Sequence, residues 1–345
     1  MTKFPDDAPL VAIKRGGLVE SVHRGRIVFC DPEGNVLEAA GDPDGCFFPR
    51  SAMKPFQAVP LILSGAADAF GLSDEELAIA CASHKGEERH VETVRSLLRK
   101  AGLSEDALDN GAHPPSDAAS ADALARDGKP FRKVHGNCSG KHAGMVAVCA
   151  HEGWDAGAYR EPGHPLQVWI RSLLAKACGL SPEELIPGGD GCGAPAFAMP
   201  IKNFSTAFAR LAMGENLPED VARAAFRLRV AMRSHPFMVS GTGGFDTEVM
   251  ENTDLVAKGG AGGVWAAGSG EGWGMAVKIS DGAGRAGRSS GVGRRARAAG
   301  DRVWGGLLPG SRPSWRKGGG DAPDRSARKP GEMASRVNEY PPPSV

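Results

Sequence analysis

The pattern of apolar and polar residues predicts short strands at both ends of the chain. Near the N-terminus, residues 11–14, 19–22, 26–29 and 36–39 are short segments rich in β-branched side chains. Residues 32–35, with proline, glycine and asparagine, predict a turn between the last two. A second group of predicted strands covers residues 255–258, 263–266 and 275–279.

The intervening stretch, from residue 51 to about 234, is helical in character. Ser73 followed by Glu76, and Ser181 followed by Glu184, each match the capping box that starts a helix. Between residues 219 and 232, apolar residues recur at helical spacing and predict one buried face: Val221, Ala224, Ala225, Leu228, Ala231 and Met232. We expect an α+β fold whose antiparallel sheet is built from N- and C-terminal strands, with a helical region between them.

Composition adds that the chain can build a substantial core. It has 345 residues, of which 41% are hydrophobic. No apolar stretch reaches the ~18 residues that a membrane span needs, and the N-terminus lacks the apolar run of a signal peptide. We therefore expect a cytoplasmic protein with no membrane partner. Its seven cysteines are odd in number and scattered, which favours reduced thiols or metal ligands over a disulfide framework.

The net charge of zero conceals an asymmetry. Residues 287–345 carry 12 Lys or Arg and 5 Asp or Glu, so this segment has a charge of +7 and the rest of the chain −7. The segment also has 18 Gly or Pro and no helical or alternating periodicity, so we expect a disordered tail. Because it lacks aromatic interleaving and a binding motif, we expect no nucleic-acid partner.

Ser51 and Lys54 form an S-x-x-K pattern at a predicted loop-to-helix transition. On a helix these positions share a face, so a neutral Lys54 can take the hydroxyl proton and make Ser51 a nucleophile. The lysine pKa must then fall by roughly 3 units from ~10.4, which costs about 4 kcal/mol and requires burial or neighbouring cations such as Arg50. A helix cap beside a surface lysine gives the same pattern, and one chance match is expected in a chain of this length.

A second serine and a second lysine make the catalytic interpretation stronger. Serine β-lactamases and penicillin-binding proteins combine S-x-x-K with a serine from the helical part and a Lys-Thr-Gly on a strand. This chain has Ser83 near a predicted helix end, and Lys258 followed by two glycines after a predicted strand. Two pairs around one site are therefore expected: Ser51 with Lys54, and Ser83 with Lys258.

Residues 137–142 place a thiol, a hydroxyl, an amine and an imidazole within about one helical turn. A phosphate loop fits poorly, since its first glycine is absent and His142 replaces the Ser or Thr that would bind magnesium. Cys138 as a nucleophile would have a histidine base but no identifiable third residue. Alternatively, Cys138 and Cys192 offer thiolates for zinc, with Lys141 or His142 as a nitrogen donor. Two inert buried cysteines remain the simplest alternative.

Six segments, in order, resemble the blocks of the Rhizobium-type L-asparaginases, a third asparaginase class that is similar in fold to serine β-lactamases and glutaminases. They are Arg-Ser-Ala-Met-Lys-Pro (50–55), Cys-Ala-Ser-His-Lys-Gly-Glu (81–87), Asn-Cys-Ser-Gly-Lys-His-Ala-Gly (137–144), Asp-Gly-Cys-Gly-Ala-Pro (190–195), Gly-Thr-Gly-Gly-Phe-Asp-Thr (241–247) and Ala-Lys-Gly-Gly-Ala (257–261). The resemblance runs from about residue 8 to 286, and the block around Cys138 is its most specific part.

The resemblance implies an amidohydrolase that converts L-asparagine to L-aspartate and ammonia. The catalytic residues that it implies are Ser51, Lys54, Ser83 and Lys258. It also implies zinc bound beside the serines, in support of substrate binding more than of the chemistry, by Cys138, Lys141 and Cys192. Residues expected at the substrate are Arg50, Asp190 and His142, the first two on grounds of charge complementarity to the α-carboxylate and α-ammonium groups. A homodimer is the family's usual assembly.

The chain departs from the family pattern in three places. Gly262 stands where a glutamate is expected, and Gly244 where an arginine is expected. After residue 286 the family continues into a packed helix and a closing strand, whereas this chain has its Gly/Pro/Arg-rich tail. We therefore expect a catalytic domain over residues 1–286 and a tail over 287–345, with a reading-frame shift as the hypothesis for the change. The alternatives are a glutaminase, a penicillin-recognising acyl hydrolase, or an inactive zinc-binding remnant.

Overall fold

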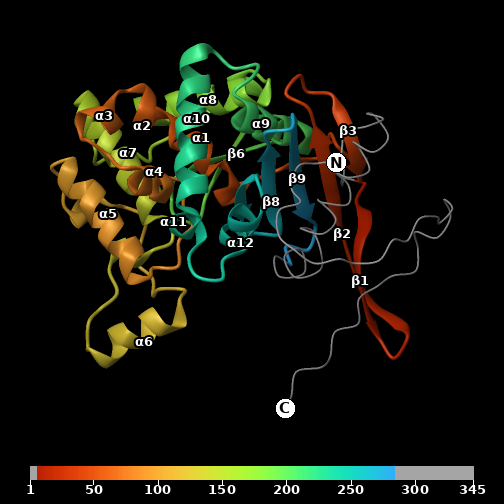
Figure 1. Cartoon of the computed structure of the whole chain (residues 1–345), viewed down its shortest axis with the longest axis horizontal. Helices are drawn as coiled ribbons and strands as arrows, with labels where there is room; N and C mark the ends of the chain where they lie inside the picture. Colours follow the sequence, from red (N-terminus) through yellow and green to blue (C-terminus); the bar gives the residue numbers. More distant parts are fainter. Residues whose placement is uncertain (1–5, 284–345) are drawn as a thin grey trace, which may run out of the picture.

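Strands from both ends of the described chain form one antiparallel sheet (Figure 1). The computed structural model describes residues 6–283. The strand order is β1-β2-β9-β8-β7, and β3 pairs with residues 27–30 of β2, on the edge opposite β9. The strands are β1 (Ala8–Arg15), β2 (Leu18–Cys30), β3 (Val36–Ala40), β7 (Val256–Gly260), β8 (Val264–Ser269) and β9 (Trp273–Ile279). The predicted α+β class, with a sheet assembled from both ends, is confirmed.

Pairing between β2 and β9 joins the N-terminal strands to the C-terminal ones. Ile27 lies opposite Val277 in this antiparallel ladder. The segments 19–22 and 26–29, predicted as separate strands, are parts of the single strand β2. Gly25, which lies between them, pairs with Ala8 on one side and Ile279 on the other, so the ladders on both sides keep the strand continuous.

Helix α9 (Ile201–Met213) packs across β8, β9 and β2. The Ser205 hydroxyl lies 3.0 Å from the carbonyl oxygen of Val28 and 2.9 Å from that of Gly274, and it donates to one of them at a time. A Cβ atom on Gly274 would lie 2.1 Å from the Ser205 carbonyl oxygen. Glycine at this position therefore permits the close approach of helix and sheet.

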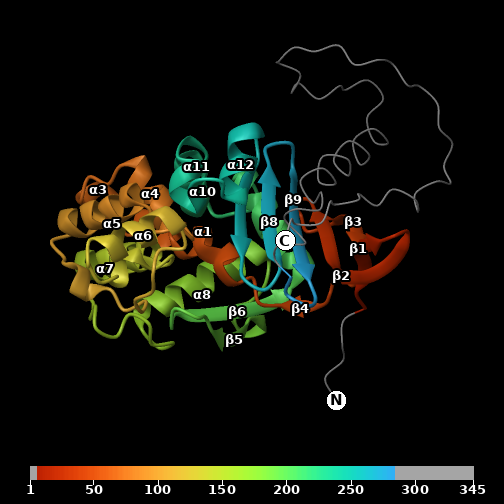
Figure 2. The ribbon, with the colours of Figure 1, turned by 90° about the horizontal axis from the view of Figure 1, so that it is seen from below.

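The other helices gather on the side of the molecule away from β1, β2 and β3 (Figures 1 and 2). They are α1 (Lys54–Gln57), α2 (Val59–Leu63), α3 (Ala66–Ala69), α4 (Asp74–Ala80), α5 (Glu88–Lys100), α6 (Ala118–Arg126), α7 (Ser139–Glu152), α8 (Pro165–Cys178), α10 (Glu219–Ser234), α11 (Pro236–Ser240) and α12 (Phe245–Asn252). Short 3-10 helices are η1 (Arg50–Met53), η2 (Glu105–Ala107), η3 (Lys133–His135) and η4 (Pro182–Glu184). The six apolar residues predicted to face the core on α10 are all buried.

Both predicted capping boxes are present, but they start different elements. Ser73 and Glu76 cap α4 through reciprocal side-chain to backbone hydrogen bonds. Ser181 and Glu184 make the same arrangement over η4, a single 3-10 turn. A helix was expected to start at Ser181, but the structure has only this single 3-10 turn there.

A second, three-stranded sheet takes two of its strands from the stretch that was expected to be helical. Its order is β4-β6-β5, with β4 (Cys46–Phe47), β5 (Ile186–Gly189) and β6 (Pro195–Pro200), all antiparallel; β5 and β6 run along the lower edge in Figure 2. β5 and β6 are short and contain proline or glycine, so they lack a period-2 signal. The helical prediction for residues 51–234 is wrong at β5 and β6.

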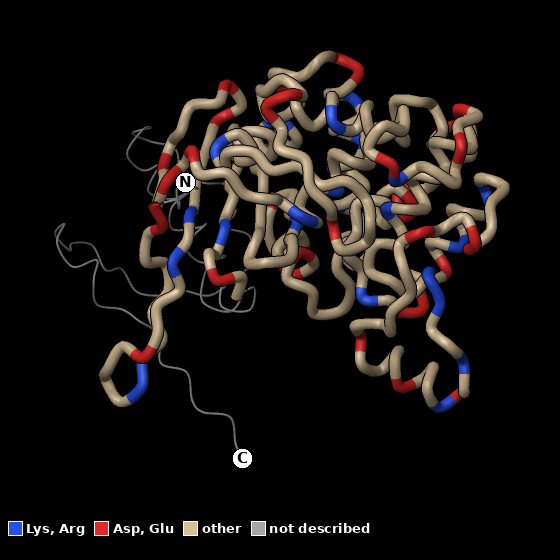
Figure 3. The backbone as a smooth tube through the Cα atoms, turned by 180° about the vertical axis from the view of Figure 1, so that it is seen from behind, with Lys and Arg blue, Asp and Glu red and all other residues tan. Residues whose placement is uncertain are grey.

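Acidic and basic residues are intermixed along the described backbone (Figure 3). No helix within residues 6–283 is long and apolar enough to cross a membrane. The predicted domain boundary at residue 286 and the predicted tail lie outside the described residues.

Candidate active site

The first catalytic candidates meet where η1, the start of α1 and β7 come together. Ser51 lies on η1, which packs against β7. Lys54 begins α1 and is fully buried. Lys258 lies in the middle of β7 and is also buried. Segments about 200 residues apart in the sequence therefore supply neighbouring side chains.

Lys54 contacts Ser83, which lies in the loop between α4 and α5. The Lys54 Nζ donates to the Ala82 carbonyl oxygen at 2.6 Å and lies 2.9 Å from the Ser83 Oγ. Burial lowers the pKa of Lys54, and the nearby charges of Lys141 and Lys258 act in the same direction. The amine is thus placed beside a serine hydroxyl in an environment that favours its neutral form. The sequence paired Lys54 with Ser51, whereas the hydrogen bond goes to Ser83.

Lys258 contacts Asp246 of α12, a residue that the sequence did not single out. Its Nζ lies 3.2 Å from the Asp246 Oδ2 and donates to the Gly259 carbonyl oxygen at 2.8 Å. The same Oδ2 accepts the Gly259 N–H at 2.9 Å, and Oδ1 accepts the Trp265 Nε1–H at 3.0 Å. The expected partner of Lys258 was Ser83, but the structure gives Lys258 a carboxylate.

The loop that carries Ser83 is anchored to the segment before α12. The Ser83 N–H donates to the Val239 carbonyl oxygen at 3.0 Å. The Glu87 carboxylate accepts the Thr242 N–H at 2.8 Å and the Thr242 hydroxyl at 2.6 Å, and Lys85 donates to the Thr242 carbonyl oxygen. Two of the six sequence blocks are therefore held together through Thr242.

The three expected metal ligands lie together in the interior. Cys138, Lys141 and Cys192 are all buried, and the Lys141 Nζ donates to the Cys192 Sγ at 2.9 Å. A hydrogen bond between the two sulfurs, helped by the charges of Lys54 and Lys141, lowers the pKa of Cys138 against the effect of burial. Burial favours a neutral Lys141, but the charges of Cys192 and Cys138 outweigh it and raise the pKa of Lys141.

No group of three His, Cys, Asp or Glu side chains within residues 6–283 could hold a metal ion. A metal bound by Cys138 and Cys192 would therefore depend on a nitrogen donor such as Lys141.

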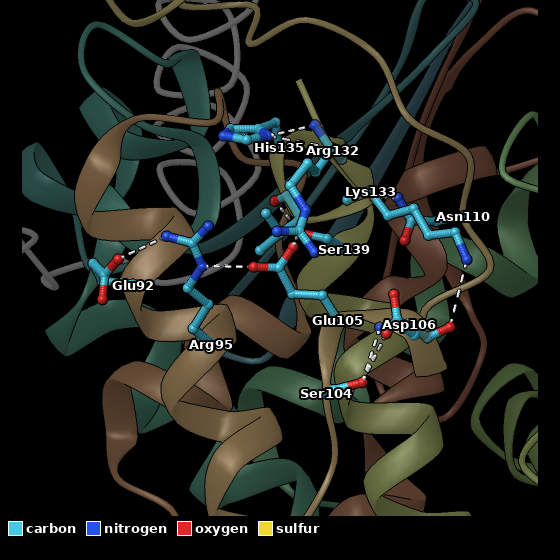
Figure 4. Close-up of polar contacts among 11 residues, drawn as sticks. Glu92, Arg95, Ser104, Glu105, Asp106, Asn110, Arg132, Lys133, His135 and Ser139 are labelled. Atoms are coloured by element: carbon cyan, nitrogen blue, oxygen red, sulfur yellow. Dashed lines mark hydrogen bonds and ion pairs between the residues drawn. The ribbon is translucent and has the colours of Figure 1, made fainter. Parts of the chain in front are cut away.

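The loop before Cys138 is held by a polar network, shown in Figure 4. Glu105 accepts from the Arg95 Nε at 2.7 Å and pairs with the Arg132 Nε at 2.9 Å. The Asn110 amide donates to the Lys133 carbonyl oxygen at 2.9 Å, and the Ser139 hydroxyl donates to the Val134 carbonyl oxygen. These contacts fix the path of the chain into α7, whose first turns carry Lys141 and His142.

Arg50 and Asp190 contact each other. The Arg50 Nε donates to the Asp190 Oδ1 at 2.9 Å. Burial acts to raise the pKa of Asp190, but the Lys141 charge and the Arg50 hydrogen bond outweigh it, so the pKa falls. Arg50 also has φ of 54°, a left-handed conformation that is uncommon outside glycine and that recurs at functional sites.

His142 is buried beside this cluster with one unpartnered nitrogen. Its Nδ1 lies 2.6 Å from the Tyr159 hydroxyl, which in turn accepts the Asp109 N–H at 2.9 Å. Among residues 6–283 the Nε2 atom has no hydrogen-bond partner. Burial, assisted by the Lys141 charge, holds the pKa of His142 well below its usual range, so the ring is neutral.

The comparisons with known proteins identify the family of the chain. Residues 11–291 match the model of the L-asparaginase II family. The family match defines the class of the protein, an amidohydrolase. The chain belongs to the L-asparaginase II family, as its resemblance to the Rhizobium-type enzymes predicted.

The solved structures that resemble the chain have low sequence identity to it. The protein Mglu in its native form is 15% identical over 84% of this chain and 67% of that chain, with a TM-score of 0.38. The Bacillus subtilis glutaminase YbgJ, in covalent complex with 5-oxo-L-norleucine, is 14% identical over 78% and 84%, with a TM-score of 0.34. A β-lactamase from Mycobacterium bovis is 12% identical over 77% and 90%, with a TM-score of 0.42. The curated proteins gave no match.

Proposed function

We propose that this amidohydrolase converts L-asparagine to L-aspartate and ammonia by Ser/Lys catalysis. The observation that carries the proposal is the contact of 2.9 Å between the buried Lys54 amine and the Ser83 hydroxyl. Membership of the L-asparaginase II family supports asparagine as the substrate. Ser51, three residues before Lys54, offers a second hydroxyl at the same site.

The proposed reaction has two stages. A serine hydroxyl gives its proton to the neutral Lys54 amine, and its oxygen attacks the side-chain amide carbon of asparagine. The carbon–nitrogen bond breaks as Lys54 returns the proton to the leaving nitrogen, which departs as ammonia and leaves an ester on the serine. Water then attacks the ester with Lys54 again as base, so that aspartate and free serine are formed.

Substrate recognition is assigned to charged and polar groups beside the serines. Arg50 and Asp190 can exchange part of their mutual contact for the α-carboxylate and the α-ammonium group. Neutral His142, whose Nε2 has no partner in the described part of the chain, offers one further hydrogen bond.

We also propose that Cys138, Lys141 and Cys192 hold zinc. Two sulfurs and one nitrogen, buried side by side, fit the donor preferences of this ion. When bound, the ion supplies a Lewis acid that orients a substrate oxygen. Lys141 would give up a proton to become a ligand.

Three variants test the serine and lysine assignments: Ser51→Ala, Ser83→Ala and Lys54→Met. Ammonia release from L-asparagine is measured for each, with circular dichroism as a check of folding. Lys54→Met should lose about 10²–10⁴-fold in kcat, since it removes the proposed acid–base group. The serine whose loss also abolishes the covalent ester intermediate is the nucleophile. Ser64→Ala, at the end of α2, is the control and should keep full activity.

Three results would overturn the proposal. Full activity in both serine variants would remove Ser/Lys catalysis. Faster turnover of L-glutamine or of a β-lactam than of L-asparagine would replace the substrate assignment, and a folded wild-type chain without any turnover would leave the inactive zinc-binding remnant.

A further inference from the structure

Asp246 is a buried carboxylate beside a proposed catalytic lysine. Its residue exposure is 4%, and the structure provides it with three N–H donors: Lys258 Nζ, the Gly259 backbone and the Trp265 indole. Both carboxylate oxygens are therefore engaged. A carboxylate that accepts several N–H bonds in a buried place is stabilised in its ionised form.

Lys258 is the cation that matches this charge. It is 1% exposed, and its amine lies 3.2 Å from Asp246. Removing an ammonium ion from water without a partner is costly, whereas an adjacent hydrogen-bonded carboxylate offsets that cost. The ion pair therefore explains how Lys258 can be charged inside the protein.

The two lysines of the site have partners of different kinds. Lys54 donates to the Ala82 carbonyl oxygen and lies beside the Ser83 hydroxyl, and the charge of Cys138 acts on it against the effect of burial. Lys258 contacts a carboxylate. Lys54 and Lys258 therefore lie in different environments, which suit the two lysines to different roles.

We propose that Asp246 is a positioning residue that holds Lys258 as a permanent ammonium ion, so that Lys258 supplies fixed positive charge to the active site and takes no proton from a serine. This inference rests on the proposed Ser/Lys hydrolysis. It revises the expectation of two equivalent Ser/Lys proton relays.

The other titratable groups around β7 do not replace Asp246. Burial lowers the pKa of Lys54, at the start of α1, and this residue is the proposed base. Burial raises the pKa of Cys81, at the end of α4, to about 12 even though Lys258 and Lys54 act to lower it, so its thiol is neutral. Trp265, on the neighbouring strand β8, contributes an uncharged donor. Among these described neighbours, Asp246 is the counter-ion of Lys258.

The first test compares Asp246→Asn with Trp265→Phe over a range of pH. Asparagine removes the negative charge and keeps the shape, so Lys258 loses its counter-ion. If the charge of Lys258 is needed, kcat of Asp246→Asn falls as pH rises, and its alkaline limb moves to lower pH by about one unit or more. Trp265→Phe removes a hydrogen bond to the same carboxylate but leaves the ion pair, so its pH profile should match the wild type.

Two outcomes of that comparison would overturn the inference. If Lys258 is a base, Asp246→Asn will instead shift the acid limb to lower pH and gain activity there. If Asp246 is only structural, both variants will lose activity without any change in the shape of the profile.

The second test needs neither activity nor a folded Asp246 variant. In the full chain labelled with ¹⁵N-lysine, the Lys258 Nζ signal is assigned as the one that is lost in Lys258→Arg. It should keep the chemical shift of an ammonium group from about pH 6 to pH 9. A neutral amine at Lys258 near pH 7 overturns the inference, whereas failure of the wild type to hydrolyse asparagine overturns only the proposed function.

Discussion

At the scale of single residues, Gly140 explains why the block around Cys138 contains a glycine. It lies in the first turn of α7, where this helix crosses α4, and a Cβ atom there would lie 2.1 Å from the Ile79 carbonyl oxygen. The crossing places Lys141 and His142 beside the active site. A larger residue would have to push α7 away from α4, and the two candidate ligands with it.

Replacing Gly140 by alanine should therefore destabilise the protein by about 1–3 kcal/mol, the usual cost of inserting a methyl group into a packed core. Chemical denaturation of the wild type and the variant measures this change. Gly163→Ala is the control, because a Cβ atom there has no atom within 4 Å. Equal stability of the two alanine variants would show that α7 and α4 separate freely.

The sequence could not predict how the proposed catalytic residues pair with one another. Segment order was enough to place Ser51, Lys54, Ser83 and Lys258 in one region. The pairing of Ser51 with Lys54 assumed an α-helix, but the backbone here is a 3-10 turn that starts from a left-handed Arg50. The contact between Lys258 and Asp246 depends on how α12 packs on the sheet. No local sequence pattern predicts this packing.

At the scale of elements, the sequence correctly predicted the features that contacts between neighbouring residues stabilise. The α4 cap and the buried face of α10 follow from side chains three or four residues apart, and both are present. The strands β5 and β6 were missed because partners in space stabilise them, and their proline and glycine residues hide any alternation. The second sheet was therefore not predicted from the sequence, because pairing between strands, and not a local pattern, stabilises it.

The cap of α4 predicts a pH dependence of stability. Glu76 is buried, which acts to raise its pKa, but Lys100 at 2.7 Å and the Ser73 N–H at 2.7 Å outweigh burial and lower it. A lowered carboxyl pKa stabilises the fold above the unfolded value of about 4.3, and this contribution is lost as pH falls through the folded value.

Glu76→Gln should therefore be less stable than the wild type near neutral pH, and the difference should shrink as pH falls below about 4. Urea denaturation at a series of pH values measures it. Glu184→Gln, in the same capping arrangement over the single turn η4, is the control and should change stability less. A stability difference for Glu76→Gln that stays constant down to acid pH would contradict the assignment.

At the scale of the whole molecule, long-range contacts bring both the sheet and the proposed zinc site together. β2 pairs with β9 across about 250 residues of chain, and the proposed ligands come from the start of α7 and from the loop before β6. An ion held by Cys138, Lys141 and Cys192 would cross-link the helical half to the small sheet. Because these side chains meet only in the folded chain, binding there is linked to folding.

Zinc should therefore raise the melting temperature, and a chelator should reverse the change. A ligand at 100 times its Kd adds about 2.7 kcal/mol to the stability of the state that binds it. The measurement is a thermal melt of the metal-free full chain with zinc added, together with the number of zinc ions bound per chain. Cys192→Ser removes one proposed ligand and should abolish both the shift and the bound ion, whereas Cys178→Ser, at a buried cysteine in α8, should keep them. An equal shift in wild type and Cys192→Ser would place zinc elsewhere, and no shift in the wild type would remove the metal from the proposed site.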